Sequence, residues 1–311
     1  TGLRVSALGL GTLTWSRDTD EHAAAEQLRD FVDAGGTLLD TAASYADGDA
    51  ERLIGSLLGS RLSRDDVVLC TKAGIRRTPH GPVVDASRGA LLDSLDASLT
   101  RLGTDHVDLF VVQSPDHRTP LTETAEALRH VLTTGRARYV GLSNHAGWAT
   151  ARVGTLLGQG QQLAAVEVEY SLLQRGIERE VVPAAREVGA GVLAWSPLGR
   201  GVLTGKYRHA IPADSRAAST HLAGFVEPYL GRASQPVVDA LVTAADGLER
   251  TPLEVALAWV LGRDQVASAI VGARTAAQLS AALDLDLSLP AQIVAALDEV
   301  SAPAAGYPER R

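Results

Sequence analysis

The sequence contains very little sulfur and no long apolar run. Among 311 residues there is one cysteine, Cys70, and no methionine. A single cysteine excludes a disulfide framework within the chain and a zinc site built from cysteines. No apolar stretch approaches the ~20 residues that a membrane-spanning helix needs. The first residues show no basic segment followed by an apolar one, so we expect no secretory signal and a cytoplasmic location.

Positive charge is also in short supply. The chain carries 29 basic and 37 acidic residues, which gives a net charge of −8. Nucleic acids and anionic membranes bind basic faces, so this balance argues against both as main partners. Lys72 and Lys206 are the only lysines among the basic residues. Where arginine is the usual cation, a lysine is a candidate for chemistry that needs a compact ammonium, with chance placement as the alternative.

Short β-like runs alternate with helix-like stretches along the whole chain. Many runs are apolar through most of their length, as strands covered on both faces should be. Between them apolar residues recur at helical spacing; Asp20, for example, is a suitable N-cap for a helix with Ala24, Leu28 and Phe31 on one face. The predicted strands are Ala7–Thr12, Thr37–Asp40, Val67–Lys72, Val107–Gln113, Ala137–Ser143, Ala164–Tyr170, Gly191–Ser196 and Ser268–Gly272.

Eight strands that alternate with helices predict a (β/α)8 TIM barrel, with a doubly wound sheet as the alternative. We expect a single domain over residues 1–311. Two segments fall outside the alternation. Residues 199–234, after the seventh predicted strand, form a long irregular stretch of the kind that serves as a lid or binding loop. An extra helix is predicted near the end of the chain, at Pro290–Val300.

Three side chains near the ends of successive predicted strands suggest an acid site. Asp40 ends the second strand, Tyr45 follows it, and Lys72 ends the third. Active sites of such barrels gather at the carboxyl ends of the strands. An ammonium lowers the pKa of a nearby phenol, and a carboxylate keeps the ammonium charged. The three residues therefore predict a phenol that protonates a developing alkoxide. Taken singly, each residue has an alternative role: a helix cap for Asp40, a packing residue for Tyr45 and a solvated charge for Lys72.

A series of short motifs follows the predicted strands in order, from about residue 9 to residue 279. They are Gly9-Leu10-Gly11-Thr12, Asp40-Thr41-Ala42 with Tyr45, Thr71-Lys72, Val107-Asp108-Leu109-Phe110, Ser114-Pro115-Asp116, Gly141-Leu142-Ser143-Asn144, Glu169–Leu173, Trp195–Lys206, Val271–Arg274 and Gln278-Leu279. Together they resemble the motifs of the aldo-keto reductase superfamily. Their layout is closer to its bacterial and potassium-channel β-subunit branches than to the mammalian aldose-reductase branch.

The resemblance implies a (β/α)8 barrel that binds extended NADPH without a Rossmann domain. It makes Tyr45 the general acid, tuned by Lys72 and Asp40. It also implies that Trp195 stacks on the nicotinamide ring and that Arg274 meets the 2′-phosphate. An acidic protein that binds an anionic nucleotide needs such local cations. The residues implied at the cofactor are Gly11, Thr12, Ser143, Asn144, Glu167, Trp195, Ser196, Leu198, Gly199, Gly201, Lys206, Gly272, Arg274 and Gln278.

The sequence departs from the family pattern at three places. Gln113 stands where the family has a histidine at the end of the fourth strand. A glutamine amide donates a hydrogen bond but cannot ionise, so it cannot relay a proton. Glu167 replaces the usual glutamine beneath the nicotinamide, which places an extra carboxylate near the ring unless the side chain points elsewhere. Ala281 and Ala282 replace polar residues, which predicts fewer contacts to the adenosine.

Two functions from different classes are consistent with these motifs. The first is an NADPH-dependent reductase that converts a ketone or aldehyde to an alcohol, with Tyr45, Lys72, Asp40 and Gln113 at the reacting carbonyl. The arginine-rich and alanine-rich composition suggests a GC-rich genome, which favours a polyketide or deoxysugar ketone of secondary metabolism. The alternative is an NADPH-binding regulatory or scaffold subunit with weak residual activity, because the channel β-subunits also lack the histidine.

The substrate side of the site is expected to be apolar. Trp15 and Trp148 follow predicted strand ends, and together with Trp195 they are predicted to wall a pocket for a ketone larger than acetone. The expected partner is thus a small carbonyl compound, with no metal, no nucleic acid and no membrane. A homo-oligomer is compatible with the sequence.

Overall fold

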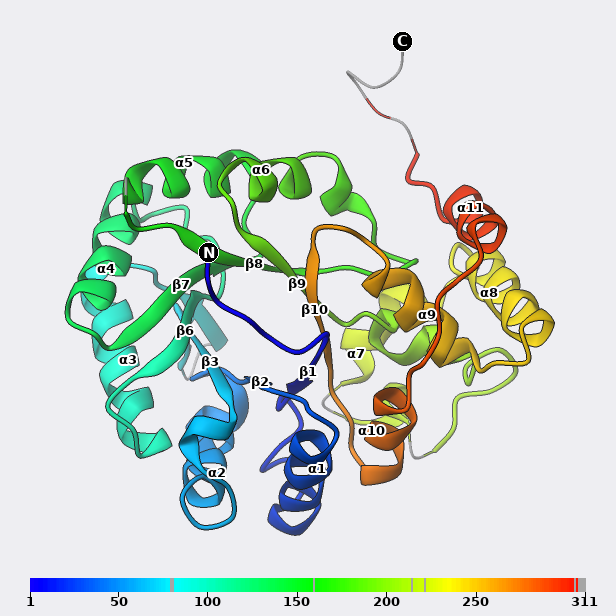
Figure 1. The fold of residues 1–311 in the computed structure, drawn as a ribbon, viewed down its shortest axis with the longest axis horizontal. Coiled ribbons are helices and arrows are strands. Elements are labelled where there is room, and N and C mark those ends of the chain that lie inside the picture. The colour runs from blue at the N-terminus through cyan, green and yellow to red at the C-terminus, as the bar shows by residue number, and fades with distance from the viewer. Residues whose placement is uncertain (79–80, 159, 214, 221, 305, 307–311) are drawn as a thin grey trace.

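Eight parallel strands close into a barrel at the centre of the computed structural model (Figure 1). The strand order is β1-β10-β9-β8-β7-β6-β3-β2, and β1 pairs with both β2 and β10. Because a doubly wound sheet keeps two open edges, this closure confirms the predicted barrel and excludes that alternative. The structure describes residues 1–78, 81–158, 160–213, 215–220, 222–304 and 306.

All eight predicted strands are present, each within three residues of its expected bounds. They are β1 (Leu8–Gly11), β2 (Leu38–Asp40), β3 (Val68–Ala73), β6 (Val107–Val112), β7 (Ala137–Ser143), β8 (Leu163–Glu169), β9 (Gly191–Trp195) and β10 (Val266–Val271). Their apolar character follows from their position, since helices cover the outside and side chains of the other strands fill the inside.

Helices surround the strands on the outside of the barrel (Figure 1). They are α1 (Glu21–Asp33), α2 (Asp49–Leu57), α3 (Arg88–Leu102), α4 (Leu121–Thr133), α5 (Gly147–Leu157), α6 (Val181–Glu187), α7 (Ala223–Val226), α8 (Gln235–Gly247), α9 (Pro252–Leu261), α10 (Ala276–Leu283) and α11 (Ala291–Val300). The last of these confirms the predicted extra helix, with Pro290 as its N-cap. Within the described residues, no helix is both long enough and apolar enough to cross a bilayer.

Helix α1 shows how local sequence sets these elements. The side chain of Asp20 accepts a hydrogen bond from the backbone N–H of Ala23 at 2.9 Å, as the N-cap prediction requires. Ala24, Leu28 and Phe31 are fully buried against the barrel. The chain leaves the helix at Gly35, whose φ of +81° is the left-handed conformation that favours glycine after a helix.

Outside the segment after β9, helix α9 and a hairpin were not predicted. Helix α9 buries six consecutive residues, Val255 to Val260, so its apolar residues form no single stripe for periodicity to detect. Its capping box, formed by Thr251 and Glu254, was the available signal. The second element is an antiparallel hairpin after β3, made of β4 (Ile75–Thr78) and β5 (Gly81–Val84).

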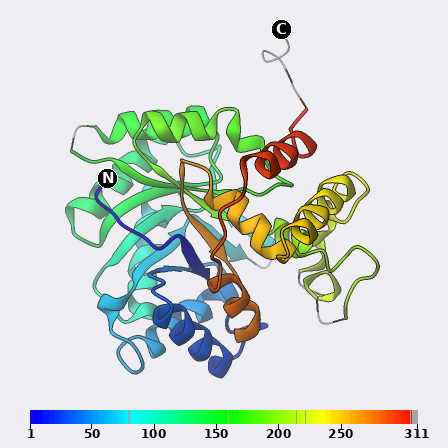
Figure 2. The same ribbon diagram turned by 45° about the vertical axis from the view of Figure 1, so that its right-hand side comes forward.

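The long segment after β9 is more ordered than the sequence suggested. It contains the 3-10 helices η4 (Gly199–Thr204), η5 (Arg216–Ala218) and η6 (Glu227–Tyr229) as well as α7. Figure 2 shows this segment beside α8 at one side of the barrel. Positions 214 and 221 of the predicted stretch 199–234 lie outside the described residues. The expected long loop is present, and short helical turns shape it.

Candidate active site

A cavity of about 620 Å³ lies at the carboxyl ends of the barrel strands, and its wall contains residues of seven of them together with Gln113, directly after β6. Its volume is in the range of small-molecule sites in proteins. The residues that line it are Gly11, Leu13, Asp40, Tyr45, Lys72, Gln113, Ser143, Asn144, Glu167, Trp195, Ser196, Pro197, Leu198, Arg200, Gly201, Thr204, Lys206, Arg216, Phe225, Leu253, Ile270, Val271, Gly272, Arg274, Ala277, Gln278 and Ala281.

The two-residue period of the strands explains why these side chains meet. An apolar cluster inside the barrel contains Leu38, Cys70, Val111, Ala165 and Leu193. Side chains two residues apart on a strand share a face. The residues two positions further along these strands therefore face the same interior, one layer closer to the carboxyl end. Those residues are Asp40, Lys72, Gln113, Glu167 and Trp195.

Lys72 lies at the centre of a buried polar cluster. Its Nζ atom donates to Asp40 Oδ1 at 2.6 Å and to the carbonyl oxygen of Thr41 at 2.9 Å. Glu167 Oε1 lies 3.2 Å from the same nitrogen. Burial alone would lower the pKa of Lys72, but the two carboxyl groups outweigh it and raise that pKa well above its ordinary value. The lysine therefore stays an ammonium.

The phenol of Tyr45 lies next to this ammonium, with Lys72 Nζ 5.3 Å from the ring centroid. Burial nevertheless raises the pKa of Tyr45 above its ordinary value, and Asp40 and Glu167 add to the rise. The charge and a hydrogen bond of Lys72 offset part of it. The expectation that the neighbouring ammonium leaves Tyr45 with a lowered pKa was therefore wrong, because burial, supported by the charge of Asp40, outweighs the ammonium.

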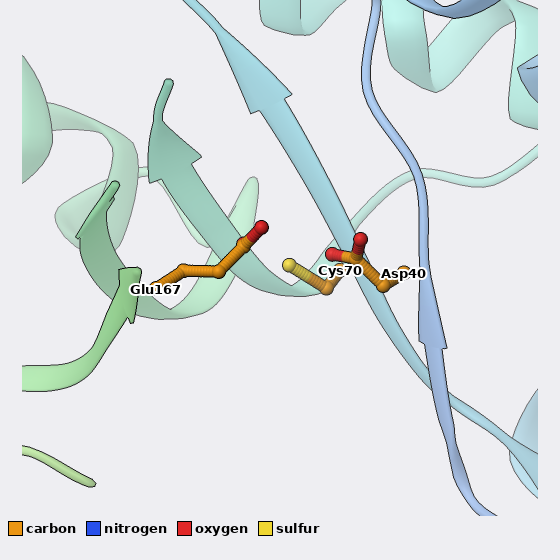
Figure 3. Close-up of side chains that lie close together, drawn as sticks. All are labelled: Asp40, Cys70 and Glu167. Carbon is orange, nitrogen blue, oxygen red and sulfur yellow. The ribbon is translucent and has the colours of Figure 1, made fainter. Parts of the chain in front are cut away.

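Glu167 is the third titratable side chain of this cluster, and it reaches across the barrel from β8 toward Cys70 and Asp40 (Figure 3). Ligand-type atoms of these three buried residues lie within 4.8 Å of one another. Lys72 Nζ contacts both carboxyl groups and thus supplies the positive charge that a metal ion would bring to them. We accordingly assign no metal to this cluster.

Gln113 follows β6 and lines the cavity beside Tyr45. The Gln113 side-chain oxygen, Oε1, accepts a hydrogen bond from the hydroxyl of Ser44 at 3.0 Å. Its backbone oxygen accepts one from the amide of Asn144 at 3.0 Å. Because Ser44 fixes the carbonyl end of the side chain, the Gln113 Nε2 group is the end available to donate to a ligand oxygen.

A second hydrogen-bonded group joins β7 to β9. The indole N–H of Trp195 donates to Asn144 Oδ1 at 3.1 Å, and Asn144 Nδ2 donates to the hydroxyl of Ser143 at 3.0 Å. Asn144 and Ser196 have φ values of +61° and +51°. Left-handed backbone at residues other than glycine is strained and concentrates at functional sites. Arg200, with a φ of +59°, adds a third case at the same cavity.

Two arginines, Arg216 and Arg274, line another part of the cavity. Burial and the neighbouring charge of Arg274 lower the pKa of Arg216 below its ordinary value. Among the described residues, no carboxylate forms a salt bridge with either guanidinium. Arg216 Nη2 donates to the carbonyl oxygen of Gly272 at 2.9 Å. Two like charges held together without a salt bridge to a carboxylate of the described residues form a site that favours a multiply charged anion.

The segment after β9 closes one side of the cavity through Arg200. Its guanidinium binds both oxygens of Glu169, at 2.7 and 2.6 Å, and lies 4.1 Å from the ring centroid of Phe225. Phe225 in turn stacks on Trp195, with ring centroids 6.3 Å apart. A charged bidentate pair and an aromatic stack thus attach this segment to the ends of β8 and β9.

Comparison with known proteins identifies the family. The sequence pattern of the Aldo/keto reductase family matches residues 7–302. The chain belongs to the aldo/keto reductase family. The resemblance seen in the motifs is confirmed over nearly the whole chain, and this aldo/keto reductase is an oxidoreductase that acts on a carbonyl/alcohol pair with a nicotinamide cofactor.

Curated relatives agree with the family. The chain is 33% identical to the uncharacterized oxidoreductase YrpG of Bacillus subtilis (strain 168), with 96% of this chain and 93% of the relative aligned. It is 35% identical to the L-glyceraldehyde 3-phosphate reductases of Escherichia coli strains K12 and O157:H7. Those alignments cover 89% of this chain and 83% of each relative.

Most of the site residues predicted for this aldo/keto reductase line the same cavity. Four do not. Thr12 donates its N–H and its hydroxyl to the carbonyl oxygen of Asp40, both at 3.0 Å, and thereby joins β1 to β2. Gly199 is buried outside the lining, and a Cβ there would lie 2.8 Å from Leu173. For both residues, the structure indicates a role in shaping the backbone near the cavity.

The two tryptophans predicted to wall the pocket were assigned wrongly. Trp15 is fully buried against α1, where its indole N–H donates to Gln27 Oε1 at 3.1 Å. An indole whose N–H is satisfied by a helix side chain is a core residue. Trp148 is the second residue of α5 and is 64% exposed, outside the cavity lining. Among the three predicted tryptophans, Trp195 is the one in the cavity.

Sequence reasoning missed Arg216, Arg200 and Phe225. All three come from the long segment after β9, where no periodic pattern places a side chain. The motif Trp195–Lys206 contains Arg200 without giving it a role and ends before Arg216 and Phe225. Arginine is also so common in this chain that its presence carries little information. The expectation that residues 199–234 form a binding loop was the available signal.

Proposed function

We propose that the protein is an NADPH-dependent reductase that converts a ketone or aldehyde to an alcohol. One observation carries the proposal: a single cavity is lined by the Tyr45–Lys72–Asp40 cluster and by the Arg216–Arg274 pair. The first can deliver a proton to a carbonyl oxygen, and the second can bind the phosphate that distinguishes NADPH from NADH.

The side chains that line the cavity are chemically suited to a nicotinamide dinucleotide. The arginine pair is electrostatically suited to a phosphate dianion. The ring of Trp195 offers an aromatic wall, and Gln278 lines the same cavity near Arg274. Glu167 Oε2 is buried with no hydrogen-bond partner, which leaves one polar atom for a bound group to satisfy.

In the proposed reaction, the residues of the chain have separate roles. The cofactor, when bound, supplies a hydride to the carbonyl carbon. Tyr45 gives its phenolic proton to the carbonyl oxygen, and the charge of Lys72 stabilises the phenolate that remains. Asp40 holds Lys72 as an ammonium at 2.6 Å. Gln113 Nε2 donates a neutral hydrogen bond to the same carbonyl oxygen.

The substrate proposal combines the cavity wall with a relative's name. Leu13, Leu198 and Phe225 make part of the wall apolar, as suits a carbonyl compound with a hydrocarbon body. The Escherichia coli relatives are named for reduction of a phosphorylated aldehyde. We propose that both substrate types be compared, with short phosphorylated aldehydes against larger ketones of the polyketide and deoxysugar kind. NADPH oxidation followed at 340 nm is the assay, with Tyr45→Phe as the reference.

Two observations favour a second candidate, an NADPH-binding regulatory subunit with weak residual activity. The site has no imidazole at position 113, and burial raises the pKa of Tyr45. Tight NADPH binding without oxidation of NADPH by any aldehyde or ketone of the panel is the result that would favour this candidate. Turnover that depends on Tyr45 rules it out.

The contribution of Gln113 is expected to be smaller than that of Tyr45. Gln113→Ala removes a neutral hydrogen bond that contributes about 0.5–1.5 kcal/mol, so kcat should fall roughly tenfold. Steady-state kinetics on the best substrate of the panel provide the measurement. Gln235→Ala, an exposed position on α8, is the matched control and should leave kcat unchanged. A loss as large as that of Tyr45→Phe would contradict a role limited to a neutral donor.

A further inference from the structure

Two carboxyl groups share one ammonium at the floor of the cavity. Lys72 Nζ is 2.6 Å from Asp40 Oδ1 and 3.2 Å from Glu167 Oε1. The carboxyl groups approach from opposite sides of the barrel, Asp40 from β2 and Glu167 from β8. All three residues are at most 3% exposed. Water therefore does not screen the interactions among them.

The charges of this cluster do not balance if both carboxyl groups are ionised. One ammonium neutralises one carboxylate, and a second buried carboxylate without its own partner is costly. The shorter contact assigns the ammonium to Asp40. Among the described residues, the shared ammonium is the one group that stabilises a negative charge on Glu167, since its Oε2 is buried without a hydrogen-bond partner. Burial and the charge of Asp40 raise the pKa of Glu167 to about 8. These observations favour the neutral acid form of Glu167 at neutral pH.

We propose that Glu167 is a positioning residue of the acid site that acts through Lys72, and that its protonation state sets the acidity of Tyr45. The proposal rests on the proposed function of Tyr45 as the general acid. When Glu167 is a neutral acid, the positive charge of Lys72 interacts with Asp40 and Tyr45. As a carboxylate, it competes for that charge and adds a second negative charge near the phenol, so Tyr45 becomes a weaker acid.

The groups around Glu167 support its role as the residue whose protonation state controls the acidity of Tyr45. On the neighbouring strands Glu167 pairs with Ser143 and Leu193, which carry no charge. Burial raises the pKa of the Cys70 thiol well above its ordinary value, so it stays protonated. Gln113 cannot ionise. The titratable and charged groups that face Glu167 are Asp40 of β2, Cys70 and Lys72 of β3, and Tyr45 of η1 (Tyr45–Gly48).

The protonation state itself can be measured without catalysis. Infrared difference spectra of the protein labelled with ¹³C-glutamate should show the C=O stretch of a protonated carboxyl group at pH 7. That band should disappear as the pH rises through about 8, and it should be missing in Glu167→Gln. Glu187→Gln, at an exposed position on α6, is the matched control and should keep the band. Absence of a titrating glutamic acid band from the wild-type protein overturns the proposal, even if Glu167→Gln does not fold.

The coupling to Tyr45 has its own readout. Phenolate absorbance, taken as the difference between each protein and its Tyr45→Phe counterpart, gives the pKa of this phenol. Removal of a neighbouring negative charge should lower that pKa by about 1–3 units in Glu167→Gln. Glu187→Gln should leave it unchanged. The same Tyr45 titration in wild type and Glu167→Gln would mean that Glu167 does not act on Tyr45.

The pH dependence of turnover follows with a defined sign. A carboxyl group with a raised pKa is neutral below that pKa and charged above it, so wild-type kcat/KM should fall as the pH rises through about 8. In Glu167→Gln this alkaline limb should move to higher pH by about one unit or more. An unchanged limb overturns the proposal. The spectroscopic measurements do not depend on catalysis. Full turnover by Tyr45→Phe would therefore contradict the proposed function but would leave the measured coupling between the pKa values of Glu167 and Tyr45 unchanged.

Discussion

Replacement of Tyr45 by phenylalanine is expected to lower kcat on the best carbonyl substrate by about 10²–10⁴-fold, the usual contribution of a general acid. The ring packs against the apolar core, and phenylalanine keeps that contact. The change removes the hydroxyl beside Lys72 and leaves the buried Lys72–Asp40 pair in place. Stopped-flow or steady-state measurement of NADPH oxidation checks the result.

Tyr139→Phe is the control for this substitution. Tyr139 lies on β7, four residues before Ser143, and packs in the apolar cluster inside the barrel. Its loss of a hydroxyl should leave kcat unchanged. Full turnover by Tyr45→Phe would falsify the catalytic proposal and make the NADPH-binding subunit the better account. A parallel measurement of NADPH affinity should show little change, because the hydroxyl acts on the substrate oxygen.

Replacement of Arg274 or Arg216 by alanine is expected to weaken NADPH binding by about 10- to 150-fold each. A hydrogen bond to a charged group contributes about 1.5–3 kcal/mol, and each 1.4 kcal/mol is a factor of ten. NADH has no 2′-phosphate, so its affinity should change much less, and the preference for NADPH should shrink by a similar factor. Fluorescence titration with both cofactors measures these affinities.

The comparison with NADH also separates phosphate binding from packing. Arg216 donates to the carbonyl oxygen of Gly272, and a Cβ at Gly272 would lie 3.1 Å from Arg216 Nη2. If alanine disturbed this contact alone, affinity for both cofactors would fall together. Arg232→Ala, an exposed position before α8, is the control for net charge. Equal affinities for NADPH and NADH in the wild-type protein would contradict the assignment of the arginine pair.

Local sequence determined much of the barrel. Apolar runs such as Val107–Val112 have no polar alternation, and they became strands buried on both faces. The cap at Asp20 and the turn at Gly35 delimit α1 as their chemistry requires. Helix α9 escaped prediction because it is apolar all round and periodicity detects a stripe. Local rules thus worked for buried strands, which read as short apolar runs, and for helices with one apolar face, and they failed for a helix that is buried all round.

The acid site was predictable for a related reason. Asp40 and Lys72 stand at strand ends, and in a barrel all strand ends meet at one edge. The position of Trp195 followed in the same way. Trp15 and Trp148 were placed near strand ends by the same argument, and it failed for them because they lie beyond the strands. There the direction of a side chain depends on the loop, which contacts from distant segments determine.

The sequence by itself thus determined the alternation of strands and helices, the residues at each strand end, and a family whose motifs run along the chain in order. Closure of the barrel decided the rest. It brought Glu167 of β8 to within 3.2 Å of Lys72 of β3, so that two carboxyl groups contact one ammonium. Arg216, more than fifty residues before Gly272, likewise reached its carbonyl oxygen only through the fold. Charge balance and burial depend on distances across the barrel, and these exist only once the ring of strands has closed.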